Sequence, residues 1–256
     1  MNARAQGVIL LLLGGAVLRA TLTDMHLRYV KESLGPFLIG AGLLLVAAAA
    51  MTLLHEARRE RAAARAGATP PDHGDDGPGD GPGDGHDDGH GHRPRVAWLL
   101  ILPAVGLLFV APPALGSYTA DQAGTALSAD WGADDSPLPA GDPVDIQVVD
   151  YASRAVYGKG TTLRGRRIQL TGFLLRGRDG TPFLARIMLS CCAADGRPIK
   201  VGLSGDAPAG QPADTWVRVV GRFSDRTTPD PVNGEPIPFL EVESWQGVRE
   251  PKQPYE

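Results

Sequence analysis

The chain has few of the residues that most often perform catalysis. It contains two cysteines and six histidines in 256 residues, and no histidine follows His92. A thiol in the C-terminal part therefore has no imidazole in residues 93–256 to act as its base. The sequence also lacks a phosphate-binding glycine loop, a Gly-x-Ser-x-Gly elbow and paired acidic residues at a catalytic spacing. We therefore expect that the protein is not an enzyme.

Long uncharged runs, by contrast, are frequent in the first half of the chain. Residues 34–54 and 96–115 are uncharged, and each is long enough to cross a bilayer as a helix. A shorter run extends to a third span, about 5–22, if Arg19 reaches the interface. A cleaved signal peptide is the alternative for this first run, but the residues after Arg19 make a poor cleavage site. We expect three transmembrane helices.

The basic residues set the expected orientation of these spans. Six arginines lie between the second and third runs, whereas residues 116–150 contain no Lys or Arg. The positive-inside rule therefore places the N-terminus and the loop 66–95 in the cytoplasm. The chain after residue 115 then lies outside, and cleavage of the first run would leave this placement unchanged. The expectation is a multi-pass protein of the cell membrane with an extracytoplasmic C-terminal domain.

The cytoplasmic loop contains a tract of unusual composition. Residues 72–92 consist only of Asp, His, Gly and Pro, so they cannot bury apolar surface and we expect disorder. Imidazole and carboxylate groups suit Zn²⁺ or another divalent transition metal, bound weakly and exchangeably. A solvated acidic linker is the alternative. The candidate ligands are His73, His86, His90, His92, Asp84, Asp87 and Asp88.

The remaining residues predict a tether, 116–141, and one domain, 142–256. Asp142 and Pro143 are typical of a helix start, and the helix should end at Gly158. Gly- and Pro-rich turns then separate five short apolar runs. The fold class is therefore N-terminal transmembrane α-helices plus a C-terminal all-β domain, a small five-stranded OB-like barrel preceded by a helix, with a small sandwich as the alternative. The expected strands are 167–175, 183–189, 199–203, 216–223 and 239–248.

The charge of this domain bears on its partners. Residues 142–256 contain 15 Lys and Arg against 14 Asp and Glu, so the domain is nearly neutral. A barrel that binds nucleic acid normally presents a positive surface with stacking aromatic residues. We therefore expect no nucleic-acid partner.

Both cysteines lie in one motif, Met188-Leu-Ser-Cys191-Cys192-Ala-Ala-Asp195. Two thiolates suit Zn²⁺ or Cu(I), with Met188 or Asp195 as a neighbouring ligand. We expect the pair to end the second strand, where side chains alternate between faces, so a turn or bulge would be needed for both to meet one ion. Intermolecular disulfides, or packing of two small buried residues, are the alternatives.

At this motif the sequence resembles the YcgQ-like family of bacterial two-component permease subunits, whose C-terminal domain carries a Cys-Cys motif. The segments that carry the resemblance are 183–195, 165–173 and 216–221. The resemblance implies a large multi-span permease as partner and a role in metal homeostasis.

The first hypothesis is therefore an integral membrane accessory subunit of a permease with a metal-contacting His/Asp loop. A stand-alone membrane metal buffer or sensor is the second hypothesis, and it differs by lacking a multi-span partner. An extracytoplasmic thiol oxidoreductase is the third, and it requires a reactive Cys191 or Cys192. The absence of histidine from this domain counts against the third hypothesis.

Overall fold

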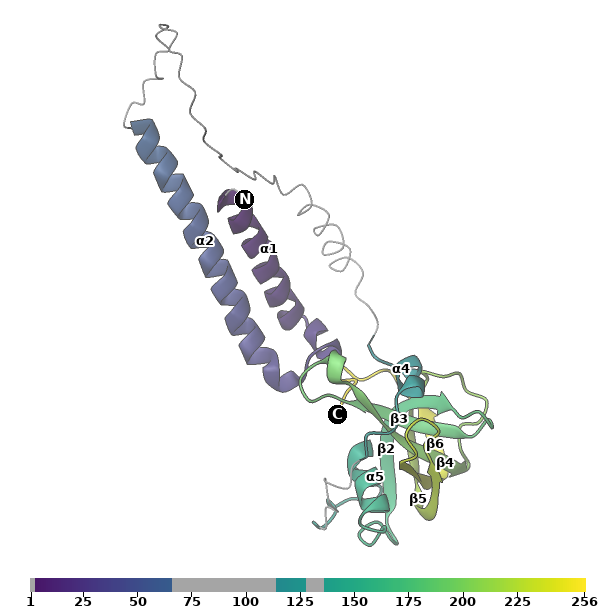
Figure 1. The fold of residues 1–256 in the computed structure, drawn as a ribbon. Helices are drawn as coiled ribbons and strands as arrows, with labels where there is room; N and C mark the ends of the chain where they lie inside the picture. The colour runs from purple at the N-terminus through teal and green to yellow at the C-terminus, as the bar shows by residue number, and fades with distance from the viewer. Residues whose placement is uncertain (1–2, 66–113, 128–135) are drawn as a thin grey trace, which may run out of the picture. The chain divides into compact units, whose positions relative to one another are not determined.

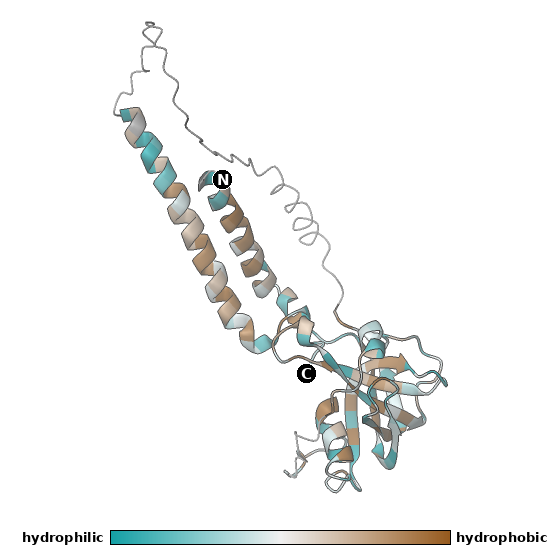
Figure 2. Ribbon diagram, in the orientation of Figure 1, coloured by the Kyte–Doolittle hydropathy of each residue, from teal (hydrophilic) through white to brown (hydrophobic). Residues whose placement is uncertain are grey.

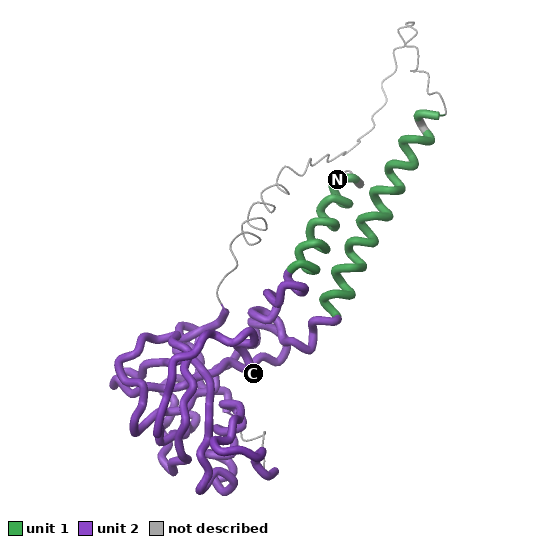
Figure 3. The backbone as a smooth tube through the Cα atoms, turned by 180° about the vertical axis from the view of Figure 1, so that it is seen from behind, with its two compact units in different colours: residues 1–19, 37–112 green, residues 20–36, 113–256 purple. Residues whose placement is uncertain are grey.

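The computed structural model describes residues 3–65, 114–127 and 136–256. The chain divides into two compact units (Figure 3), of which one comprises residues 1–19 and 37–112 and the other residues 20–36 and 113–256. The loop 66–95 and all but the last two residues of the predicted span 96–115 lie outside the described residues.

Two long apolar helices dominate the described N-terminal part. The helix α1 covers Ala3–Leu22 and α2 covers Gly35–Arg65, and both are long and apolar enough to cross a membrane. Apolar residues follow both helices along most of their length, and many are exposed (Figure 2). Exposed apolar surface of this extent indicates association with a membrane. The structure confirms helices at the predicted runs 5–22 and 34–54. The helix α2 continues beyond residue 54 because Ala, Glu and Arg favour helix.

Glycine lets α1 and α2 approach each other closely. A Cβ atom added to Gly14 would lie 2.9 Å from the Val46 side chain and 3.0 Å from the Gly42 carbonyl oxygen. One added to Gly42 would lie 2.8 Å from Leu18. Small residues at such contacts allow the close packing that holds helices together in lipid.

The segment between the two helices forms two short 3-10 helices. They are η1 (Met25–Arg28) and η2 (Glu32–Leu34), and they belong to the same compact unit as the C-terminal domain. We call residues 23–34 the juxtamembrane turn.

The C-terminal domain is a closed five-stranded β-barrel, as the sequence predicts (Figure 1). The sheet order is β1-β2-β3-β4-β6-β5. Pairing of β2 with β5 closes strands β2–β6 into the barrel, and the short strand β1 adds to the edge of β2. Pairing is antiparallel except between β4 and β6 and between β1 and β2. The strands are β1 (Val144–Asp145), β2 (Arg167–Arg176), β3 (Pro182–Met188), β4 (Arg197–Gly205), β5 (Trp216–Pro229) and β6 (Pro236–Gly247).

The barrel interior is filled by side chains that alternate along the strands. Ile168 and Leu170 on β2 and Val217 and Val219 on β5 are fully buried. The helix α5 (Val148–Val156) packs against the same core, and the hydroxyl of its Tyr151 donates a hydrogen bond to the Phe239 carbonyl oxygen at 2.6 Å. Burial of this apolar surface, at roughly 25 cal/mol per Å², is the main force that holds the domain together.

Two sequence expectations for this domain need correction. The helix starts at Val148 instead of Asp142, because Val144–Asp145 pairs with β2 as a short strand. The segment 116–141 is not simply a tether: residues 117–122 form a helix, α4 (Ser117–Gln122), and the side chain of Leu127 is buried in the barrel core.

Candidate metal site at the cysteine pair

The two cysteines lie in the turn between β3 and β4. Because β3 ends at Met188, Cys191 and Cys192 follow the strand instead of ending it. A one-turn 3-10 helix, η4 (Ala193–Asp195), begins after Cys192. This turn replaces the strand alternation that would have sent the two thiols to opposite faces. Both thiols are free, and Cys191 is exposed while Cys192 is half-buried.

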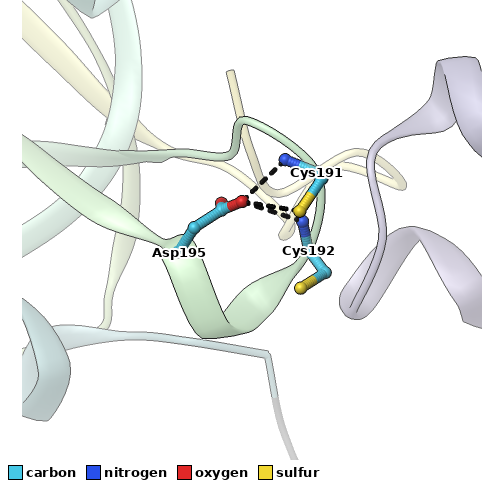
Figure 4. A group of neighbouring side chains, drawn as sticks. All are labelled: Cys191, Cys192 and Asp195. Atoms are coloured by element: carbon cyan, nitrogen blue, oxygen red, sulfur yellow. Dashed lines mark hydrogen bonds between the residues drawn. The ribbon is translucent and has the colours of Figure 1, made fainter.

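The carboxylate of Asp195 organises this turn. Its Oδ2 atom accepts hydrogen bonds from the N–H groups of Cys191 at 2.8 Å and Cys192 at 3.3 Å, and from the Cys191 thiol at 2.9 Å (Figure 4). Its Oδ1 atom accepts a bond from the N–H of Ser190 at 2.9 Å. Three consecutive amides thus converge on one carboxylate, an arrangement that favours its ionised form.

These hydrogen bonds set the charges of the metal-free cluster. The bond from the Cys191 thiol, followed by those from backbone N–H groups, lowers the pKa of Asp195 to about 2. The bond to the Asp195 carboxylate, followed by that with Cys192, raises the pKa of Cys191 to about 11. At neutral pH the cluster therefore holds a carboxylate beside a protonated thiol. A protonated thiol is a poor nucleophile, so the arrangement does not favour thiol redox catalysis.

The donor set fits a soft or borderline metal ion. One ligand atom each from Cys191, Cys192 and Asp195 lie within 4.8 Å of one another. Zn²⁺ takes thiolate sulfur at about 2.3 Å and carboxylate oxygen at about 2.0–2.2 Å, so donors at this separation can share one ion after small side-chain rotations. No other group of three such ligands occurs among the described residues. Three protein donors leave one position of a tetrahedral ion open for a further ligand.

The cysteine turn is paired with the juxtamembrane turn through main-chain hydrogen bonds. The N–H of Lys31 donates to the carbonyl oxygen of Cys191 at 3.1 Å, and the N–H of Ala193 donates to the carbonyl oxygen of Tyr29 at 2.7 Å. Val30 and Cys192, which lie between these hydrogen-bonded residues in the two turns, form an antiparallel bridge. The candidate ligands therefore lie on the strip of backbone that holds the turn between α1 and α2.

Lys252 and Tyr255 also contact the juxtamembrane turn. The hydroxyl of Tyr255 donates to the Arg28 carbonyl oxygen at 2.8 Å and accepts a hydrogen bond from the N–H of Leu115 at 2.9 Å. Lys252 forms an exposed ion pair with Asp24 at 3.3 Å. The juxtamembrane turn is thus held to the domain at more than one place.

The predicted site residues divide into two sets. The structure brings Cys191, Cys192 and Asp195 together, and the side chain of Met188 packs against the barrel core. The loop ligands lie outside the described residues, namely His73, His86, His90, His92, Asp84, Asp87 and Asp88.

Sequence reasoning missed the contribution of Tyr29 and Lys31. Both act through backbone groups, which every residue type except proline supplies in full, and they lie more than 150 positions from the cysteines. No local sequence signal could have identified them.

Comparison with known proteins identifies the C-terminal domain. Residues 146–256 match the DUF1980 C-terminal domain. The match covers α5, the barrel strands β2–β6 and the cysteine turn, which together make up less than half of the chain. It fits the resemblance of this region to the C-terminal domain of YcgQ-like proteins. No curated protein and no solved structure matches the chain.

Proposed function

We propose that the chain is an integral membrane accessory subunit of a permease, that it serves metal homeostasis, and that its barrel domain binds Zn²⁺ through Cys191, Cys192 and Asp195. The observation that carries the proposal is the convergence of these three donors beside the turn that links two apolar helices. A metal held there is next to the membrane surface, where a transporter would take it up or release it. The permease partner follows from the family resemblance.

The pairing of the juxtamembrane turn with the barrel supports the proposed topology. The turn and the barrel belong to one compact unit, so they lie on the same side of the membrane. If α2 crosses the membrane away from this turn, the chain must cross back before residue 113. A single crossing at 96–115, where the sequence is apolar, meets this requirement, and the stretch 55–95, which contains six arginines, then lies on the opposite, cytoplasmic side.

Metal binding is tested on the full chain in detergent with Co²⁺ as a spectroscopic substitute for Zn²⁺. Thiolate ligation gives an intense near-ultraviolet charge-transfer band that carboxylate and imidazole ligands of the cytoplasmic loop do not give. We expect the band in the wild type and in Ser190→Ala, and its loss in Cys191→Ser and in Cys192→Ser. A wild type without the band would refute the metal site.

Topology is tested by labelling intact cells with a membrane-impermeant thiol reagent, in a variant in which both native cysteines are Ser. A cysteine placed at Gly81 should stay unlabelled, and one placed at Ala140 should react. The opposite pattern would overturn the proposed orientation.

The permease partnership is separated from a stand-alone buffer or sensor by mild extraction and affinity purification. Co-purification of a multi-span protein in a fixed ratio supports the accessory subunit. Purification of the chain alone, with Zn²⁺ bound, supports the buffer or sensor instead.

A further inference from the structure

We propose that metal at the cysteine pair controls how firmly the juxtamembrane turn is held to the barrel, so that metal occupancy is transmitted to the helix pair α1–α2. This inference rests on the proposed function and adds its regulation. It assigns a role to the main-chain pairing between the two turns, which metal binding alone does not require.

The candidate metal ligands and the contacts to the juxtamembrane turn share the same stretch of backbone. Cys191 supplies a side-chain ligand and, through its carbonyl oxygen, accepts the hydrogen bond from Lys31. Cys192 supplies a second ligand and forms the bridge with Val30. The same two residues therefore bind the metal and hold the juxtamembrane turn, and any change in their order affects both contacts.

The direction of the effect follows from the hydrogen bonds of Asp195. Its oxygens already accept three backbone N–H groups, and the Cys191 thiol adds a fourth hydrogen bond. When a metal binds to both cysteines as thiolates, any proton on either thiol passes to solvent and the metal replaces the Cys191 proton beside Asp195, while the backbone N–H bonds can remain. The loop thus keeps the conformation that pairs with the juxtamembrane turn and gains cross-links. Ordering the loop in advance lowers the entropy cost of pairing, so metal should tighten the docking.

Thermodynamic linkage supplies the test. If metal strengthens the docking, the docking must strengthen metal binding by the same factor. A substitution in the juxtamembrane turn that leaves all three ligand side chains unchanged should then weaken the affinity for metal.

Lys31 offers such a substitution with a matched control. Its φ is −60° and its ψ is 139°, a conformation that proline adopts without strain. Lys31→Pro removes the N–H that donates to Cys191, whereas Lys31→Ala removes the same side chain and keeps the N–H. The pair separates the hydrogen bond from the charge of the lysine.

The experiment measures Zn²⁺ affinity by displacement of Co²⁺ from the full chain, followed through the thiolate charge-transfer band. We expect Lys31→Pro to bind Zn²⁺ about threefold to tenfold more weakly than Lys31→Ala, the range expected for one backbone hydrogen bond. In parallel, hydrogen exchange of the Ala193 amide should slow when Zn²⁺ is added to the wild type, and slow less in Lys31→Pro.

Each outcome has a distinct meaning. If the wild type binds Zn²⁺ but Lys31→Pro and Lys31→Ala have equal affinity and exchange of Ala193 is unchanged by metal, this inference is wrong and the metal site stands. If the wild type gives no thiolate band, the metal site fails and the inference fails with it. Loss of the barrel fold in Lys31→Pro would appear as rapid exchange throughout β2–β6, and Tyr255→Phe, which removes the bond to Arg28, then replaces it with the same expected weakening.

Discussion

Two carboxylates of the C-terminal unit collect backbone amides in the same way but in opposite surroundings. Asp230 accepts N–H bonds from Thr125 at 2.9 Å and Val232 at 2.8 Å, and its Oδ2 lies 2.9 Å from the ammonium of Lys200. Its side chain is 0% exposed and that of Lys200 is 7% exposed. Asp195 gathers three amides in the same manner, but its remaining neighbours are the thiols of an exposed turn.

The difference separates a closed polar cluster from an open one. Around Asp230 a lysine supplies the compensating charge, and the lysine in turn donates to the Ala123 carbonyl oxygen at 2.8 Å. Among the contacts of the described residues, the Asp195 carboxylate has no cationic partner. The sulfur atoms of Cys191 and Cys192 lie beside it and could bind a cation together with the carboxylate. The same local arrangement is therefore paired with a buried cation at Asp230, whereas at Asp195 it lies beside the other two candidate metal ligands.

The largest expected effect of a single change is at Asp230. Asp230→Ala leaves the Lys200 ammonium buried without its partner, which should lower the free energy of unfolding by about 3–5 kcal/mol. Urea unfolding of the full chain in detergent, followed by tryptophan fluorescence, measures it. The double variant Lys200→Met/Asp230→Ala should recover much of the loss, because no buried charge then remains. If Asp230→Ala alone were as stable as the wild type, the buried pair of Asp230 and Lys200 would not stabilise the fold.

Glu256 should give an intermediate effect, since it is buried but less well paired. Its carboxylate accepts the N–H groups of Val148 at 2.9 Å and Val149 at 3.0 Å, and its nearest approach to the guanidinium of Arg186 is 3.6 Å. Glu256→Ala leaves the first turn of α5 without its acceptor and should cost about 1–2 kcal/mol, the usual cost of a lost helix cap. Urea unfolding tests this, with the exposed Glu250→Gln as the control.

The same residue predicts a pH dependence of stability. Burial, the largest cause, raises the pKa of Glu256 above its ordinary value of 4.5, although the two amides and Arg186 oppose the shift. A carboxyl that binds its proton more tightly in the folded state contributes stability that is complete below about pH 4.5 and is lost as pH rises through the folded pKa. Glu256→Gln should therefore lose less stability than the wild type as the pH rises from about 4.5 through the pKa of Glu256 in the folded state. If the free energy of unfolding of Glu256→Gln and of the wild type varied with pH in parallel, Glu256 would not be the source of this pH dependence.

The barrel could be predicted from the sequence because its signals are local. Apolar alternation at Ile168 and Leu170 and turn residues such as Asp179 and Gly180 act within a few positions, and the strands formed where they indicate. The start of α5 could not be predicted in this way. Asp142 and Pro143 carry the local signals of a helix start, but the acceptor that caps α5 is the side chain of Glu256, 108 positions from Val148.

The candidate site shows the same limit. Composition pointed to Cys191 and Cys192 because the chain has no other cysteine, and Asp195 lies close enough in sequence to be considered with them. The turn that brings the three together depends on backbone amides that bind Asp195, which the sequence does not specify. The pairing with Tyr29 is more remote still, because it uses only main-chain groups.

The smallest expected change in stability, and the sharpest test of the open cluster, is at Asp195. The hydrogen bond to its carboxylate, followed by that with Cys192, raises the pKa of Cys191 to about 11, so in the metal-free wild type this thiol stays protonated well above neutral pH. Its alkylation by iodoacetamide should therefore be slow at pH 8 and should accelerate with pH up to about 11. Asp195→Asn removes the negative charge, which should lower the pKa of Cys191 and so speed alkylation at pH 8. The free energy of unfolding of the barrel in urea should change little. Ser190→Ala leaves the carboxylate and its amide bonds in place and should match the wild type, with mass spectrometry following modification at Cys191. Equal alkylation rates for Asp195→Asn and wild type would mean that the carboxylate does not control the thiol, and the contrast between Asp195 and Asp230 would then reduce to a difference in burial.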